Sequence, residues 1–136
     1  MISLQLISVY LFTLSAFFII DMIWLGLISA KLYQKSLKDV INLDFKIGPA
    51  IIFYILFVLG LFIFVIEPAH GVADFSNVGI YGAIFGLISY ATYDLTNLST
   101  IKKWPTKLVI IDMIWGAILG SLTSLIGYLF FNLIIK

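Results

Sequence analysis

Apolar residues form four long runs along the chain, and the short segments between them carry most of the charged residues. The runs cover residues 4–30, 48–66, 78–98 and 108–134. Each is about as long as the ~20 residues that an α-helix, rising ~1.5 Å per residue, needs to cross the hydrocarbon of a bilayer. The pattern predicts an all-α integral membrane protein, with residues 1–136 forming one bundle of four transmembrane helices.

Composition agrees with this pattern. Hydrophobic residues make up 62% of the 136 positions and charged residues only 11%, which leaves too little polar surface to enclose a water-soluble core. We therefore expect the lipid bilayer as the main partner and no nucleic acid. The absence of cysteine excludes a disulfide, a thiolate metal site and a thiol nucleophile.

The distribution of lysine predicts the orientation in the membrane, since the chain contains no arginine. The lysines of the first loop are Lys31, Lys35, Lys38 and Lys46, and those of the third loop are Lys102, Lys103 and Lys107. The second loop and the N-terminal segment have none, and the C-terminus has only Lys136. The positive-inside rule then places the first and third loops in the cytoplasm and both termini outside.

Two segments have a less definite role. Residues 31–46 alternate lysines with apolar side chains, which predicts a short amphipathic helix in the headgroup region with Tyr33 as its interfacial anchor. A solvated loop with a few buried side chains fits the same residues. The second apolar run carries no charge, so we expect it to serve in packing alone.

Three aspartates lie inside the apolar runs. The hexapeptide IIDMIW occurs at residues 19–24 and again at 110–115, which places Asp21 and Asp112 at membrane depth, and Asp94 lies in the third run. Inserting a carboxyl group at membrane depth costs several kcal/mol of free energy, so such residues usually face a bundle interior or a cavity. Given the predicted orientation, all three lie in the cytoplasmic half at similar depth. We expect them to converge on one pocket.

Helical spacing adds neighbours to these acids. Small and polar residues recur every fourth position along the third and fourth runs, which should bring these two helices close together. The predicted ligand-binding residues are Asp21, Trp24, Tyr90, Tyr93, Asp94, Asn97, Asp112 and Trp115. The first and fourth helices run in opposite directions. If Asp21 and Asp112 are level, Trp24 and Trp115 lie one turn to either side and bracket the acids.

Several segments together resemble a known family. DMIWLG in the first run, IGPAIIFYILFVLGLFIF followed by EPA in the second, YGAIFGLISYATYDLTNLSTIKKW through the third and DMIWG in the fourth are similar to the domain-of-unknown-function family 2177. This is a group of small bacterial membrane proteins, described only as predicted four-helix proteins. The resemblance implies the four-helix fold and a bacterial cytoplasmic membrane, and it favours Asp21, Asp94, Asn97 and Asp112. It implies no reaction and no cofactor.

The family motif adds hydroxyl groups beside Asp94. Thr96 and Thr100, together with Asn97, would form an oxygen-rich set at the cytoplasmic mouth that suits a hard cation or a polar headgroup. The same side chains could equally cap the helix end.

The leading hypothesis is a membrane transport or binding protein that holds a proton, an ion or a cationic small molecule between carboxyl groups and aromatic rings. Four helices enclose little volume, so a homo-oligomer is expected if it moves a substrate. A membrane-embedded enzyme acting on a lipid or isoprenoid is the alternative, with Asp94 and Asp112 as metal ligands or as an acid-base pair. An accessory subunit, whose acids only hold helices together, is a third.

Overall fold

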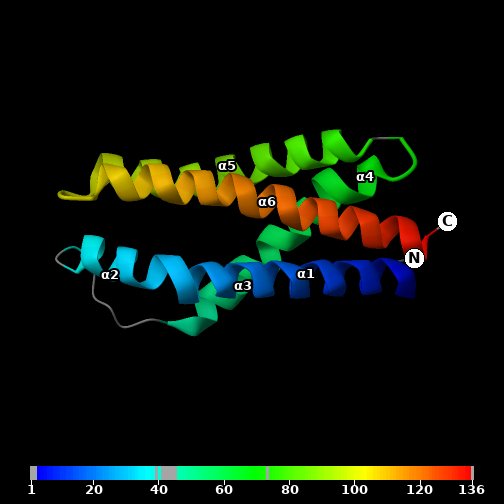
Figure 1. The fold of residues 1–136 in the computed structure, drawn as a ribbon, viewed down its shortest axis with the longest axis horizontal. Coiled ribbons are helices and arrows are strands. Elements are labelled where there is room, and N and C mark those ends of the chain that lie inside the picture. The colour runs from blue at the N-terminus through cyan, green and yellow to red at the C-terminus, as the bar shows by residue number, and fades with distance from the viewer. Residues whose placement is uncertain (1–2, 39, 41–45, 73, 136) are drawn as a thin grey trace.

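Four helices long and apolar enough to cross a membrane make up the protein, and the described residues form no strand (Figure 1). The computed structural model describes residues 3–38, 40, 46–72 and 74–135. The N-terminal and C-terminal ends lie at the same end of the bundle (Figure 1), as four successive crossings require. The prediction of an all-α fold with four helices long and apolar enough to cross a membrane is confirmed for the described residues.

The first crossing is longer than its apolar run. It consists of α1 (Leu4–Trp24), a π-helical turn η1 (Leu25–Ser29) and α2 (Ala30–Leu37), which form one continuous helix of 34 residues. The predicted amphipathic segment therefore begins as the end of the first helix, and its residues 39 and 41–45 lie outside the described part of the chain. Within α2 the lysines are exposed and Leu37 is buried, as the amphipathic pattern predicts.

The second crossing consists of α3 (Ile47–Leu61), a second π-helical turn η2 (Phe62–Ile66) and α4 (Glu67–Ala69). Pro49 lies in its first turn, where the missing N–H has no helical partner to lose. After α4 the chain turns through Gly71, whose φ of +77° is a conformation that glycine adopts without strain.

The third and fourth crossings, α5 (Phe75–Thr100) and α6 (Thr106–Ile134), pack backbone against backbone. A Cβ atom built on Gly86 would lie 1.9 Å from the carbonyl oxygen of Gly116, and one on Gly120 would lie 2.2 Å from that of Gly82. Only glycine fits so close an approach. The glycines that could have joined two copies of the chain are thus used inside one copy.

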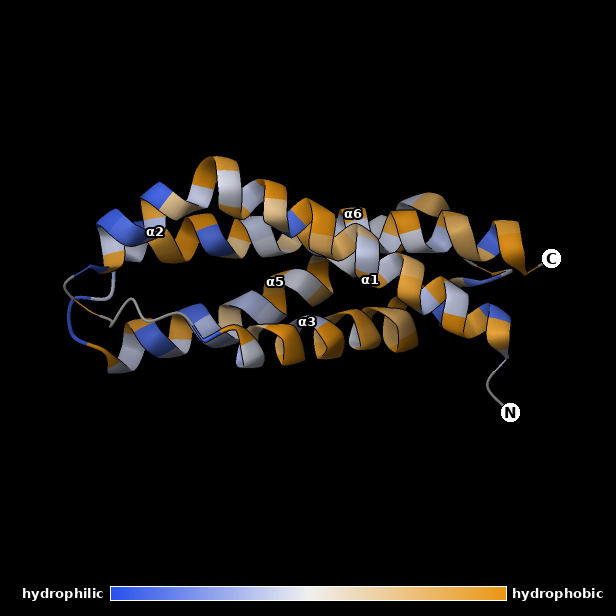
Figure 2. Cartoon of the chain, turned by 90° about the horizontal axis from the view of Figure 1, so that it is seen from below, coloured by the Kyte–Doolittle hydropathy of each residue, from blue (hydrophilic) through white to orange (hydrophobic). Residues whose placement is uncertain are grey.

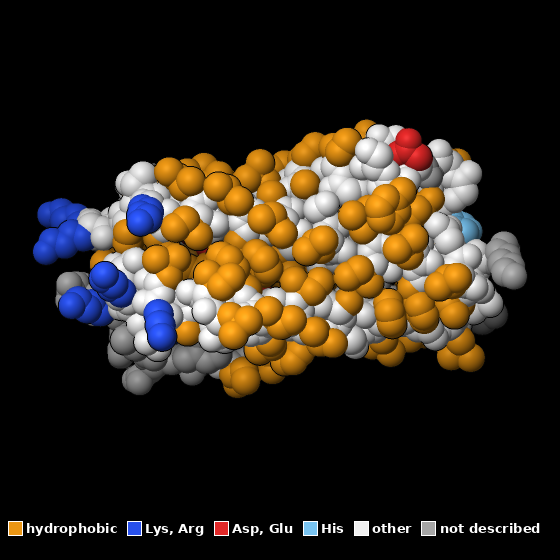
Figure 3. Space-filling view, in the orientation of Figure 1, with side chains coloured by type: hydrophobic (Ala, Val, Ile, Leu, Met, Phe, Trp, Pro, Cys, Tyr) orange, Lys and Arg blue, Asp and Glu red, His pale blue; other side chains and the backbone are white. Residues whose placement is uncertain are grey.

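The outside of the bundle is apolar and its charges lie at the two ends (Figures 2 and 3). Leucine, isoleucine and phenylalanine side chains remain exposed along all four crossings. In water such a continuous surface would cause aggregation, whereas it suits contact with lipid. Figure 3 shows the lysines at one end of the molecule, and an acidic side chain and the histidine at the other.

Two hydrophobic clusters hold the helices together. The larger one includes Val9, Phe17, Leu61 and Leu119 and joins α1, α3 and α6. The smaller one lies near the lysine end and consists of the buried residues Leu37, Trp104, Leu108 and Val109. The space between the two clusters is where the predicted site residues lie.

Candidate functional site

A cavity of about 630 Å³ lies between the two clusters, and side chains from all four crossings line it. Three carboxyl groups, four tyrosines and three tryptophans make up most of its polar and aromatic lining. They are Asp21, Asp94, Asp112, Tyr33, Tyr54, Tyr90, Tyr93, Trp24, Trp104 and Trp115, and Phe53 and Ser89 complete the set. The three tryptophans are all that the chain contains. Among the described lining residues none is a lysine or a histidine, so the side-chain charge that this lining can carry is negative.

The two copies of the hexapeptide meet at their tryptophans. The rings of Trp24 and Trp115 stack with their centroids 4.4 Å apart and their planes 5° from parallel. Asp21 precedes Trp24 by three residues, and Asp112 precedes Trp115 by three on an antiparallel helix. The acids therefore lie about one turn to either side of the ring pair. The prediction that level acids are bracketed by the rings was wrong, because the flat rings gain contact by stacking at the same depth.

Asp21 is held by two donors from other crossings. The hydroxyl of Tyr54 on α3 donates to Oδ2, and Nε1 of Trp115 on α6 donates to Oδ1 at 3.2 Å. Asp21 is itself only 5% exposed, and the Tyr54 ring packs edge-on against Phe17 at 5.0 Å. The second crossing thus does more than pack, since its Tyr54 satisfies a buried carboxyl group.

Asp112 has a partner from the amphipathic end of the first crossing. The hydroxyl of Tyr33 on α2 donates to Oδ1 of Asp112. The predicted interfacial anchor therefore points into the cavity, because the helix continues through Leu37 and carries Tyr33 against α6. Trp104 and Leu108 beside it close the lysine end of the cavity.

Asp94 differs from the other two acids because one of its oxygens is buried without a donor from the described residues. The side chain is 1% exposed, and no hydrogen bond reaches its Oδ2 from the described residues. Its carboxyl group lies within hydrogen-bonding reach of that of Asp112. One buried N–H group on the cavity wall, Nε1 of Trp104, also has no acceptor in the described part of the chain. Buried polar groups are normally satisfied, so these atoms indicate a place for a ligand or for water.

The remaining residues that the sequence singled out on α5 differ in position. Tyr90 lines the cavity and lies 6.2 Å from the Phe53 ring, while Tyr93 lies edge-on to Trp104 at 6.0 Å. Asn97 lies beside Tyr93 and does not line the cavity.

The hydroxyl groups at the end of α5 do not form part of the cavity wall. Thr96 donates to the carbonyl oxygens of Thr92 and Tyr93, and Thr100 donates to that of Thr96. Their donors are thus used within their own helix end, which is the second of the two interpretations that the sequence left open.

One family matches nearly the whole chain. It is described as a predicted membrane protein (DUF2177), and the match covers residues 6–129. The chain belongs to this family. The matched range includes every lining residue named above, and it confirms the resemblance found in the sequence. The chain matches no curated protein and no solved structure.

In this DUF2177 protein a metal ion would have few ligands. Asp94 and Asp112 are the two residues that could bind one together, and no group of three His, Cys, Asp or Glu side chains forms within the described ranges. Hard cations such as Ca²⁺ take six or more oxygen ligands, so two carboxyl groups would supply only part of the shell.

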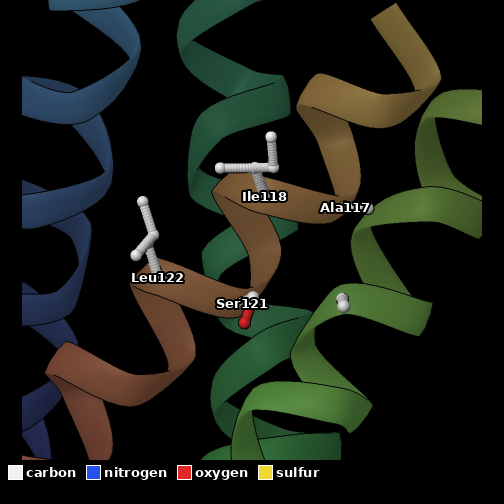
Figure 4. A pocket seen from close by; sticks show the side chains of 5 residues that line it. Ala117, Ile118, Ser121 and Leu122 are labelled. Carbon is white, nitrogen blue, oxygen red and sulfur yellow. The ribbon is translucent and has the colours of Figure 1, made fainter.

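A second hollow, of about 310 Å³, lies on α5 and α6 and is shown in Figure 4. Its lining consists of Ala83, Ala117, Ile118, Ser121 and Leu122. The hydroxyl of Ser121 is its only polar side-chain group, and it contains no residue that sequence or structure connects to chemistry. It is a hollow left by small side chains.

Sequence reasoning missed three tyrosine and tryptophan residues of the cavity wall, namely Tyr33, Tyr54 and Trp104. Tyr33 lies in the segment predicted to be amphipathic, Tyr54 lies in the uncharged second crossing, and Trp104 lies in the loop before α6. A search for polar tips on aromatic side chains in the helices and loops toward the lysine end would have found all three, because buried tyrosine and tryptophan need hydrogen-bond partners.

Proposed function

We propose that this membrane protein binds an organic cation in the cavity and functions as a small membrane transport or binding protein. The observation that carries the proposal is the carboxyl group of Asp94, which is buried in an aromatic-lined cavity with one oxygen free of any donor from the described residues. A charge buried in this way is normally paired. A cationic ligand would supply the partner.

The size and lining of the cavity favour an organic cation over an inorganic ion. Small-molecule pockets have volumes of roughly 300–1,000 Å³, and this cavity has about 630 Å³. The flat faces of Trp24, Trp115 and Tyr90 suit the apolar part of such a molecule, and aromatic faces also attract an ammonium group. A bare metal ion would use little of this surface.

The proposal is tested with benzyltrimethylammonium, which has one cationic head and one flat ring, and with its neutral isostere neopentylbenzene. Because all three tryptophans line the cavity, quenching or shift of intrinsic tryptophan fluorescence in nanodiscs reports occupancy. We expect saturable binding of the cation. Asp94→Asn should weaken it at least tenfold, about 1.4 kcal/mol or more, because the amide keeps the shape and removes the charge.

The matched control is Glu67→Gln, which removes an exposed carboxyl group at the opposite end of the bundle. The affinity of this variant for benzyltrimethylammonium should equal that of the wild type. Absence of saturable binding up to about 10 mM would exclude an organic-cation site of useful strength. Equal binding of neopentylbenzene would contradict the proposal and favour an apolar or lipid substrate. Uptake of the labelled cation into proteoliposomes then distinguishes transport from binding.

We also propose that both termini face outward and that the lysine end faces the cytoplasm, as the positive-inside rule indicates. The chain has no cysteine, so single cysteines can be introduced without background. In right-side-out vesicles, a membrane-impermeant maleimide should label Val72→Cys, which is 84% exposed, and should label Ile101→Cys only after lysis. Both positions leave every lysine in place. The reverse labelling pattern would show the opposite orientation.

A further inference from the structure

Two carboxyl groups face each other in the cavity, and none of the described lining residues is basic. Asp94 on α5 and Asp112 on α6 line the same cavity and lie within hydrogen-bonding reach of each other. A carboxylate only accepts hydrogen bonds, so a hydrogen bond between two carboxyl groups requires one proton. Tyr33 donates to Asp112, and the described residues provide no donor to Oδ2 of Asp94. The pair can therefore share one proton.

From this geometry we infer that the cavity exchanges its cationic ligand for a proton, one for one, at Asp94 and Asp112. The inference rests on the proposed function, since it requires that a cation binds there. When the ammonium group reaches the pair, it replaces the proton as the positive partner of both carboxyl groups. The proton leaves to water.

The charges balance in this step. Before binding, the pair holds two carboxyl groups and one proton, with a net charge of −1, and the free ligand carries +1. After binding, two carboxylates and the ligand have a net charge of −1, and the released proton carries +1. No bond other than the O–H bond of the carboxylic acid breaks, and no oxidant, reductant or other reactant is needed.

The surroundings leave the pair as the group that exchanges the proton. Around it lie Tyr33 on α2, Tyr90 and Tyr93 on α5 and Trp104 in the loop, whose polar hydrogens remain bound in the neutral pH range. Asp21 on α1 lies beyond the stacked tryptophans and interacts with Asp112 only through its charge, while its own oxygens accept from Tyr54 and Trp115. The described cavity wall contains no lysine or histidine that could take up the proton instead.

The test measures protons released per benzyltrimethylammonium bound to the wild-type protein. Titration calorimetry is carried out in buffers of different ionisation enthalpy, with a pH-indicator dye in weak buffer as an independent measurement. We expect one proton per bound cation, and an apparent Kd that weakens about tenfold for each unit of falling pH, as single-proton linkage requires. Glu67→Gln, which alters a carboxyl group outside the cavity, should release the same number of protons per bound cation as the wild type.

Asp112→Asn provides the second arm. It keeps an oxygen that can accept from Tyr33 and removes the second carboxyl group, so a cation that still binds should release less than half a proton. Binding without proton release by the wild type between about pH 5.5 and 8.5 would overturn the exchange and leave cation binding intact. Full release by Asp112→Asn would also overturn it. Absence of any cation binding would instead refute the proposed function, and the exchange with it.

Discussion

Replacing Gly86 by alanine should destabilise the protein by about 2–3 kcal/mol, the cost of overpacking a tight interface. The added Cβ would lie 1.9 Å from the carbonyl oxygen of Gly116 and 2.8 Å from its carbonyl carbon. These are backbone atoms, so no side chain can rotate away, and α5 and α6 would have to separate. The free energy of unfolding can be measured in mixed micelles by titration with sodium dodecyl sulfate, followed by tryptophan fluorescence.

Gly79→Ala on the same helix is the matched control. Its Cβ would lie 3.4 Å from side-chain atoms of Leu125 and Ser121, which is ordinary contact. Since alanine favours a helix over glycine by up to ~1 kcal/mol, this variant should be as stable as the wild type or more so. Two variants with the same loss of stability would show that the backbone contact between α5 and α6 has no special weight. A loss of stability in Gly86→Ala together with unchanged or increased stability in Gly79→Ala would show that the backbone contact holds α5 and α6, which form part of the cavity wall, in place.

The number of crossings and the close approach of α5 and α6 could be predicted from the sequence because both follow from local periodicity. Long apolar runs fix the crossings, and glycine at every fourth position fixes one smooth helix face. The length of the first helix could not be predicted in this way. Hydropathy changes at Lys31, but nothing between Ala30 and Leu37 breaks a helix, so the backbone continues beyond the apolar run.

The candidate site was predictable where a residue is costly in lipid or where an aromatic residue lies at helical spacing from such a residue. Asp21, Asp94 and Asp112 stand out because a carboxyl group at membrane depth is energetically costly and is usually kept there for a function. Tyr33 and Tyr54 do not stand out, since tyrosine is ordinary in a membrane helix, and their partners lie 79 and 33 residues away along the chain. The stacking of Trp24 on Trp115 depends on the relative depth of two helices. The relative depth of two helices is set by tertiary packing and cannot be derived from the residue spacing within one helix.

The three acids should differ in what they do, and Asp21 should carry most of the stability. Asp21→Ala would leave the Tyr54 hydroxyl and the Trp115 N–H without an acceptor in a largely buried place. Leaving a buried donor unsatisfied costs ~1–3 kcal/mol in general, and hydrogen bonds inside membrane proteins lie at the low end of that range. We therefore expect a loss of about 2–3 kcal/mol in the free energy of unfolding. Asp94→Asn should leave the free energy of unfolding almost unchanged, because no donor from the described residues depends on Oδ2 of Asp94.

A double-mutant cycle of Asp21→Ala and Tyr54→Phe separates the hydrogen bond from other effects of each change. Since the two groups are in direct contact, the cycle should give a coupling energy of roughly 0.5–1.5 kcal/mol. Asp94→Asn combined with Tyr54→Phe should be additive within about 0.5 kcal/mol. If Asp94→Asn destabilised the protein as much as Asp21→Ala, Asp94 would be one more acid that holds helices together, and a cavity for a ligand would be unnecessary. If Asp94→Asn instead lost cation binding at unchanged stability, the two acids would have separate roles, one structural and one in binding.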